Sequence, residues 1–199
     1  MSLKNTDVSY GSVAKWIHWI TAVCFLGAYM AVYYSQLFTE YRSPEYFSGV
    51  RIHTMLGTTV LLLFLPRLVW KLLNPEPHPD PAPQWQLLAA KFSHFALYFI
   101  LIAAPLSGWL GTGGRQVNMF GLFGIPTFRG SGFFESTFAT SRYITFPEWE
   151  IPVDFFHKQI MGEWVVWMLI AVHVAAALYH HFAQKDNTLR RMLPGIKPK

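Results

Sequence analysis

Four apolar runs, each long enough to cross a lipid bilayer as a helix, dominate this sequence: about residues 13–38, 50–73, 87–110 and 156–182. In a chain of 199 residues they leave little room for a soluble domain. The composition agrees, because 52% of the residues are hydrophobic and only 14% are charged. We therefore expect an all-α fold, an integral membrane four-helix bundle in which residues 1–199 form a single transmembrane domain.

The positive charges predict the orientation of these helices. If the N-terminus is inside, most Lys and Arg residues fall in the N-terminal segment, around the connection between the second and third runs, and in the C-terminal segment. Under the positive-inside rule both termini then lie in the cytoplasm. This topology also accounts for the net charge of +5. No run of basic and aromatic residues suggests a nucleic-acid groove, so membrane lipid is the expected partner and nucleic acid is not.

Histidines are concentrated in the last apolar run, with His157 near its start, His173 towards its end, and His180 and His181 at its exit. A helix that rises about 1.5 Å per residue puts His157 and His173 roughly 24 Å apart, most of a hydrocarbon core of roughly 30 Å. Ionisable side chains at such depth are costly and are therefore candidates for function. One helix thus carries an imidazole near each membrane face.

Sorting the histidines by depth suggests how they pair. On the periplasmic side only His53 and His157 are available. The cytoplasmic side offers five candidates: His18, His94, His173, His180 and His181. Of these, His18 and His173 are expected to lie deepest. The simplest assignment is two sites stacked across the bilayer, one formed by His53 with His157 and the other by His18 with His173.

Paired imidazoles in an apolar bundle favour haem over a bare metal ion. Zinc uses three or four protein ligands, and the single Cys24 can form no thiolate cluster. Haem needs only axial ligands, and Gly57, one turn after His53, would let its flat ring approach the backbone. Two axial histidines leave the iron no open position, which indicates electron transfer. The alternative is a bundle whose histidines only hydrogen-bond internally.

Several motifs carry a resemblance to a known family: AKWIHW, RIHTMLG, LPRLVWKL, KFSHFALYFILIAAPLSGWL and the C-terminal HVAAALYHHFAQKDNTLRRML. They resemble the prokaryotic cytochrome b561 family. Its members are four-helix dihaem cytochromes of the bacterial inner membrane, among them superoxide oxidase, and they are similar to the b-type subunits of membrane hydrogenases. The motifs cover all four apolar runs, and the last is the most specific.

The resemblance implies particular sites. It implies two haems b, with iron ligands at His18, His53, His157 and His173. It also implies that ubiquinone is a substrate near the cytoplasmic haem, with His180 as its contact, seven residues beyond His173 on the same helical face. Arg67, Lys91 and His94 are placed to meet the haem propionates.

The sequence departs from the family pattern in the last run. The pattern implies fourteen residues between the two histidines of this helix, but His157 and His173 are sixteen apart, which turns them about 160° from each other on an α-helix. The residue at the fourteen-residue spacing is Gln159, a poor iron ligand. Either a π-bulge or irregular turn near Gly162 realigns the helix, or the periplasmic haem is ligated differently. Since no third periplasmic histidine exists, His157 is the predicted ligand.

Pro152 suits the first turn of this helix.

Three functions are compatible with this sequence. The leading hypothesis is an oxidoreductase that moves electrons from superoxide, at the periplasmic haem, to ubiquinone. The second is an electron-transfer cytochrome b subunit that links the quinone pool to a periplasmic redox protein docked on the long connection at 111–151. The third is a non-redox membrane bundle or metal transporter. Glu148, Glu150 and Asp154 make the periplasmic approach less positive than an enzyme that steers superoxide would need.

Overall fold

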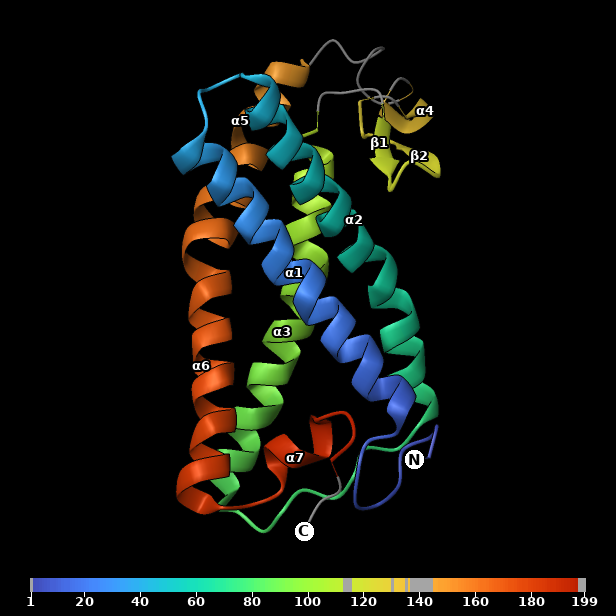
Figure 1. The fold of residues 1–199 in the computed structure, drawn as a ribbon, viewed down its shortest axis with the longest axis vertical. Helices are drawn as coiled ribbons and strands as arrows, with labels where there is room; N and C mark the ends of the chain where they lie inside the picture. Colours follow the sequence, from blue (N-terminus) through green and yellow to red (C-terminus); the bar gives the residue numbers. More distant parts are fainter. Residues whose placement is uncertain (1, 113–115, 130, 135, 137–144, 197–199) are drawn as a thin grey trace.

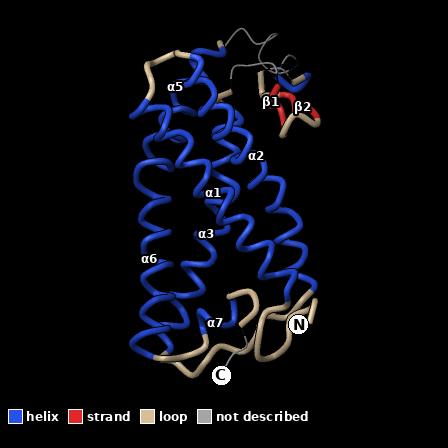
Figure 2. Tube along the Cα trace, in the orientation of Figure 1, coloured by secondary structure: helices blue, strands red, loops and turns tan. Residues whose placement is uncertain are grey.

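Four long helices form the body of the molecule (Figures 1 and 2). The computed structural model describes residues 2–112, 116–129, 131–134, 136 and 145–196. Helices α1 (Ser12–Phe38), α2 (Pro44–Leu73) and α3 (Gln84–Leu110) are each one span, and Phe146–Gln184 is the fourth. All four are long and apolar enough to cross a membrane, so the predicted all-α membrane bundle is confirmed.

The two ends of the bundle differ in what they carry. Both chain termini lie at one end, together with the short helix α7 (Thr188–Met192); we call this the termini end (Figure 1). The opposite end carries two short strands, β1 (Gln116–Met119) and β2 (Phe123–Pro126), and we call it the hairpin end. The charge pattern of the sequence predicts that the termini end faces the cytoplasm, and this orientation stays a prediction.

Three helices begin earlier than the apolar runs suggested, and in two of them side-chain caps start the helix outside the apolar segment. The second begins at Pro44, where the Ser43 hydroxyl accepts a hydrogen bond from the Tyr46 N–H at 3.1 Å. The third begins at Gln84. The fourth begins at Phe146 with a capping box in which Thr145 and Glu148 satisfy each other's backbone N–H groups. Pro152 therefore lies inside a helix and not in its first turn, contrary to our expectation.

The interior is narrow, and most large apolar side chains face outwards. Ile100 and Ala104 of α3 form a small core with Met161 and Val166 of the fourth span. Outside this core, residues such as Phe95 are largely exposed, at 71%. Such surfaces are costly in water but match the hydrocarbon of a bilayer, which is consistent with a membrane-embedded bundle.

The fourth span changes helix type along its length. It begins as α5 (Phe146–Phe155), widens into the π-helix η2 (Phe156–Val165), continues as α6 (Val166–Tyr179) and ends in a second π-helix, η3 (His180–Gln184). Each π-helical residue turns by roughly 80° where an α-helical residue turns by about 100°. Over the length of η2 this difference cancels the offset of about 160° that the sixteen-residue spacing would otherwise produce.

The expected irregularity near Gly162 is therefore confirmed as a π-helix that contains this residue. It brings His157 back onto the face of the helix that carries His173. Gln159, at the fourteen-residue spacing, is exposed.

The hairpin was not predicted from the sequence. Strand β1 pairs antiparallel with β2, and in the connecting turn both Phe120 and Gly121 have positive φ, 55° and 77°. The Trp109 indole N–H donates to the Pro126 carbonyl at 2.9 Å, which fastens the hairpin to the end of α3. A further short helix, α4 (Gly132–Phe134), follows. Other parts of the predicted connection at 111–151 lie outside the described residues.

Candidate functional site

Two histidines meet at the hairpin end. His53 of α2 and His157 of η2 have ring centroids 5.9 Å apart and ring planes at 70°. Two imidazoles that bind one metal ion from opposite sides, with metal–nitrogen bonds of about 2 Å, have centroids about 6 Å apart. The predicted periplasmic pair is therefore brought to a distance at which one metal centre fits between its rings.

Backbone carbonyls fix the proton of each ring at this end. The Nδ1–H of His53 donates to the Ala28 carbonyl of α1 at 2.9 Å, and the Nδ1–H of His157 donates to the Ala104 carbonyl of α3 at 2.9 Å. Because a carbonyl can only accept, each Nδ1 carries the proton and each Nε2 keeps a lone pair. Metal-ligating histidines have this second hydrogen bond almost without exception.

Glycine shapes the space around the same pair. A Cβ on Gly108 would lie 2.8 Å from Cε1 of His157, so α3 can approach this ring only without a side chain there. A Cβ on Gly57 would meet no atom within 4 Å among the described residues. Open space therefore adjoins Gly57, one turn from His53, as a flat ligand would require.

Three histidines gather at the termini end. His18 of α1 and His173 of α6 have ring centroids 6.4 Å apart, again close to the distance for a shared metal centre. His94 of α3 lies 6.1 Å from His173 by the same measure. The guanidinium of Arg67 donates from Nη2 to Nδ1 of His18 at 3.3 Å. In this arrangement the neutral His18 ring carries its proton on Nε2, unlike the rings at the hairpin end.

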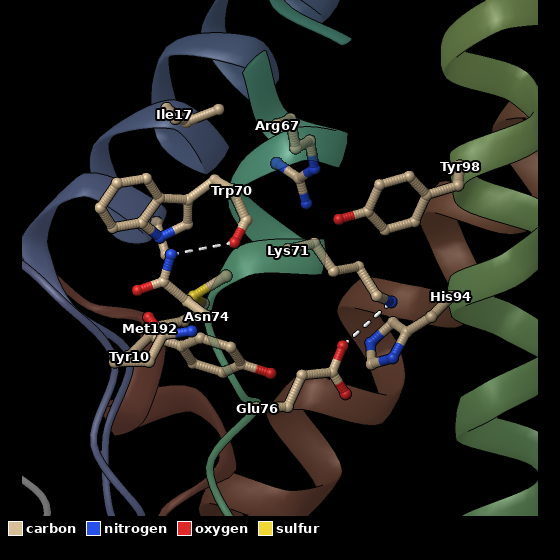
Figure 3. Close-up of a pocket in the computed structure, with 12 residues that line it drawn as sticks. Tyr10, Ile17, Arg67, Trp70, Lys71, Asn74, Glu76, His94, Tyr98 and Met192 are labelled. Atoms are coloured by element: carbon tan, nitrogen blue, oxygen red, sulfur yellow. Dashed lines mark hydrogen bonds and ion pairs between the residues drawn. The ribbon is translucent and has the colours of Figure 1, made fainter. Parts of the chain in front are cut away.

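A cavity of about 80 Å³ adjoins these histidines (Figure 3). Arg67, Lys71 and His94 line it, and both cations also lie over the ring of Tyr98, at 5.3 and 4.7 Å from the centroid. Among the described residues, neither Arg67 Nε nor Trp70 Nε1 has a hydrogen-bond partner, although both atoms are buried. These two buried N–H donors, together with the positive charges of Arg67 and Lys71, suit an acidic ligand with several acceptor oxygens.

Of the three residues expected to meet the haem propionates, Arg67 and His94 line this cavity and Lys91 does not. Lys91 is exposed and does not line it, whereas Lys71, four residues after Arg67 on the same face of α2, does. Lys71 is held by Glu76 at 2.9 Å. Burial, together with the nearby Glu76 carboxylate, raises the pKa of Tyr10 to about 12, so this phenol at the mouth stays protonated.

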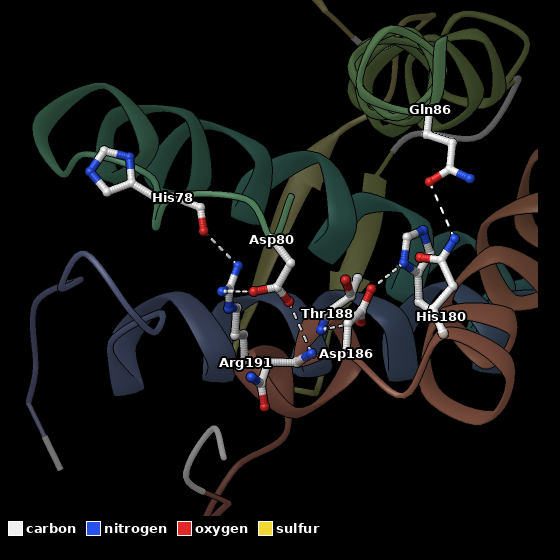
Figure 4. A network of polar contacts seen from close by, with 9 residues as sticks. His78, Asp80, Gln86, His180, Asp186, Thr188 and Arg191 are labelled. Atoms are coloured by element: carbon white, nitrogen blue, oxygen red, sulfur yellow. Dashed lines mark hydrogen bonds and ion pairs between the residues drawn. The ribbon is translucent and has the colours of Figure 1, made fainter. Parts of the chain in front are cut away.

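His180 stands apart from the cavity and pairs with a carboxylate. Its Nδ1 lies 2.5 Å from Oδ2 of Asp186 (Figure 4). The neighbouring His181 has a buried Nδ1 without a partner among the described residues. No group of three or more His, Cys, Asp or Glu side chains suited to a metal ion occurs in the described part of the chain. The histidine pairs are therefore suited to a metal that brings its own remaining ligands.

Membrane-length helices around paired interior imidazoles define a class, the polytopic membrane proteins that bind a metal cofactor between their helices. The model of one family, described as prokaryotic cytochrome b561, matches residues 9–195. The chain belongs to this family. It is therefore a multi-pass protein of the bacterial inner membrane, from a family that binds haem b and transfers electrons.

Curated relatives agree with this assignment. Cytochrome b561 homolog 2 of Escherichia coli (strain K12) is 29% identical over 199 residues, covering 97% of this chain and 95% of the relative. Cytochrome b561 homolog 1 of the same organism is 32% identical over 185 residues, or 92% and 95% of the two chains. The protein named "Probable superoxide oxidase CybB" of Yersinia pestis is 28% identical over 146 residues, or 72% and 73%.

Proposed function

We propose that this protein is a dihaem cytochrome b that moves electrons across the inner membrane, from superoxide on the periplasmic side to ubiquinone on the cytoplasmic side. One observation carries the proposal. Two histidine pairs, His53 with His157 and His18 with His173, lie at opposite ends of the bundle, each with ring centroids about 6 Å apart. Haem b, when bound, accepts and gives up one electron at a time.

The hairpin-end residues fit the axial ligation of a haem. His53 and His157 would hold the iron through Nε2, because their Nδ1 protons are donated to Ala28 and Ala104. The open space beside Gly57 gives the flat ring access to the backbone of α2. With both axial positions filled by imidazoles, oxygen cannot bind the iron, so the site is suited to electron transfer.

The termini-end residues fit the second haem and its propionate groups. His18 and His173 would supply the axial nitrogens. Arg67, Lys71 and the orphan Trp70 N–H would hold the propionate groups in the adjoining cavity. Because Arg67 donates to His18 Nδ1, binding of iron at Nε2 requires this guanidinium to turn towards the propionates. His94 would meet the same edge from α3.

Buried apolar side chains fill the middle of the bundle, between the two histidine pairs, and exclude water from it. Roughly 20 Å of helix separates His157 from His173. The core formed by Ile100, Ala104, Met161 and Val166 lies along this stretch and is at most 8% exposed. These side chains insulate the path, while electrons cross between the two sites. Ubiquinone would be bound near His180.

Pyridine hemochrome analysis, combined with stopped-flow mixing, tests this proposal. The purified protein should contain two haems b per chain. Superoxide alone should reduce them rapidly, and ubiquinone added afterwards should reoxidise them. The His157→Ala variant should retain one haem. A protein with one haem per chain, or a His157→Ala variant with two, would contradict the assignment of the pairs.

A second function is favoured by the hairpin. Its turn exposes Phe120, Leu122 and Phe123 at 56%, 81% and 56%. Apolar side chains on a hairpin at the periplasmic end could receive a periplasmic redox protein, in which case the chain is the electron-transfer subunit that links this protein to the quinone pool. Isolation of a stable complex, together with haem reduction that is slow with superoxide and fast with the bound partner, would select this function.

Membership in a haem-binding family argues against the third function, a non-redox bundle or metal transporter.

A further inference from the structure

A histidine–carboxylate pair closes the end of the fourth span (Figure 4). His180 and Asp186 are in contact at 2.5 Å, and their side chains are only 24% and 15% exposed. The chain reverses between them through Lys185, which has a left-handed backbone with φ 59°. The backbone N–H of Asp186 then donates to the His180 carbonyl at 3.2 Å. The reversal of the chain therefore holds the carboxylate beside the imidazole.

A second layer of contacts fixes Asp186 in this position. Its Oδ1 accepts the Thr188 N–H at 2.9 Å. Asp80, from the proline-rich connection before α3, accepts the Asn187 N–H at 3.0 Å and Arg191 Nη2 at 2.6 Å (Figure 4). Two segments that are about a hundred residues apart in the sequence are thus joined directly beside the pair.

Asp186 is charged in this environment. Partial burial alone would raise the pKa of its carboxyl group. Hydrogen bonds from His180 and Thr188 outweigh this effect, so the pKa of Asp186 lies below its ordinary value. When Nε2 of His180 also carries a proton, the charged Asp186 carboxylate faces a positive ring, and Nε2 can donate this proton.

The second ring nitrogen of His180 remains available to a ligand. Within the part of the chain that the structure describes, no group hydrogen-bonds Nε2. His180 follows His173 by seven residues, which places it on the same helical face and about 10 Å nearer the termini end. A quinone ring that receives electrons near His173 could therefore reach this nitrogen.

We propose that His180 and Asp186 together deliver protons to the quinone, with Asp186 acting as the positioning residue for His180. This inference rests on the proposed function. Two superoxide anions give up one electron each and leave as two O₂ molecules, and ubiquinone takes up two electrons and two protons to become ubiquinol. In each proton transfer the Nε2–H bond of His180 breaks and an O–H bond forms at a quinone carbonyl oxygen. Water at the exposed edge of the pair then returns a proton to the neutral ring.

A direct test uses the haem-loaded protein and does not need superoxide. The protein is reduced photochemically without oxygen and mixed with ubiquinone-1, and the oxidation of its haems is followed by absorbance. Asp186→Asn should slow this reaction on the order of 10²-fold, the contribution typical of general acid catalysis. Asp186→Glu should restore most of the rate. Asp80→Asn, which removes a charge from the same network without touching His180, should change the rate only a few-fold.

The pH profile separates proton delivery from a structural role. If His180 donates the proton, replacing its charged partner in Asp186→Asn should change the pH dependence of the rate, whereas a purely structural role should leave the profile unchanged. Wild-type rates and an unchanged profile in Asp186→Asn would overturn the proposal. If Asp80→Asn slows the reaction as much as Asp186→Asn and neither variant changes the pH profile, the pair has only a structural role. This result would also overturn the proposal. A wild type with two haems that does not react with ubiquinone-1 refutes the proposed quinone function and the proton pair together. A reaction with ubiquinone-1 but not with superoxide refutes only the proposed donor.

Discussion

The two ends of the bundle hold their histidines by different means. At the hairpin end, backbone carbonyls of α1 and α3 accept the Nδ1 protons of His53 and His157, so both Nε2 lone pairs are ready to bind a metal. At the termini end, Arg67 donates to Nδ1 of His18, and the tautomer is the opposite one. The rings of the first site are held by backbone carbonyls, whereas His18 in the second site is held by the charged side chain of Arg67.

This difference has a consequence for cofactor binding. The hairpin end would bind haem without changing a hydrogen bond to either ring, whereas the termini end must move Arg67 first. Preorganised sites lose less free energy on binding than sites that rearrange. We therefore expect the hairpin-end haem to be retained more tightly than the termini-end haem.

The largest effect is expected from removing a ligand at the hairpin end. His157→Ala should lower the haem content from two per chain to one and leave the second haem with its own spectrum, because the pairs share no residue. Pyridine hemochrome analysis against protein concentration measures this. Adding Gln159→His should not restore the lost haem, since η2 leaves residue 159 exposed. Restored binding of the second haem would show that η2 can become an α-helix, which would turn residue 159 towards the site.

Arg67 should matter only at the termini end. In Arg67→Gln a cation that lines the cavity beside His94 is lost, so the termini-end haem should dissociate on the order of tenfold faster. Transfer of haem to excess apomyoglobin, resolved into its two phases, measures each site separately. Arg51→Gln, an exposed arginine on the same helix, is the matched control and should change neither phase. Equal acceleration of both phases by Arg67→Gln would contradict the assignment.

Much of this arrangement could be predicted from the sequence. Run length and hydropathy were sufficient for the four spans, because a bilayer demands about twenty apolar residues per helix. Depth alone was sufficient to expect His53 near His157 and His18 near His173, since helix rise is nearly constant. These predictions needed only the position of each residue along the membrane normal, which follows from its place in a helix. That these pairs bind iron stays a prediction.

What the sequence could not give was rotation about each helix axis and structure formed by distant contacts. The extent of η2 decides which way His157 faces, and no local pattern fixes it. Lys91 was expected to meet the haem propionates, but the cavity beside the histidines is lined by Lys71 and not by Lys91. The spacing of four from Arg67 to Lys71 could have indicated this shared face. The contact between His180 and Asp186 depends on a left-handed Lys185, which nothing in its residue type predicts.

Two glycines provide a smaller and sharper test of the hairpin end. Gly108→Ala would place a Cβ 2.8 Å from the His157 ring, so the ring or α3 must shift, at a cost of roughly 1–3 kcal/mol. The spectrum and the midpoint potential of the hairpin-end haem should change, while those of the other haem should not. Redox titration monitored by absorbance distinguishes the two. A change confined to the termini-end haem would mean that the ends are wrongly assigned.

Gly57→Ala should act differently, because the protein itself leaves room for the added methyl group. Replacing a helical glycine by alanine favours the helix by up to about 1 kcal/mol, so the haem-depleted chain should be no less stable than the wild type. If a haem ring lies against this glycine, the methyl group should still accelerate haem loss from the hairpin end. Thermal unfolding of the haem-depleted protein and haem transfer to apomyoglobin give the two readouts. Unchanged haem transfer would show that the ring lies elsewhere between α2 and η2.

The smallest effect is expected from the ion pair between Lys71 and Glu76 at the edge of the cavity. Their side chains are 38% and 53% exposed, so solvent screens the pair and its loss should cost at most about 1 kcal/mol of stability. Glu76→Gln should therefore leave unfolding nearly unchanged and free Lys71 to reach an acidic ligand in the cavity. Haem loss from the termini end should become slightly slower, and the hairpin end should not respond. Faster loss would mean that Glu76 orients Lys71 towards the propionates and does not compete with them, which would make the termini end more preorganised than its hydrogen bonds suggest.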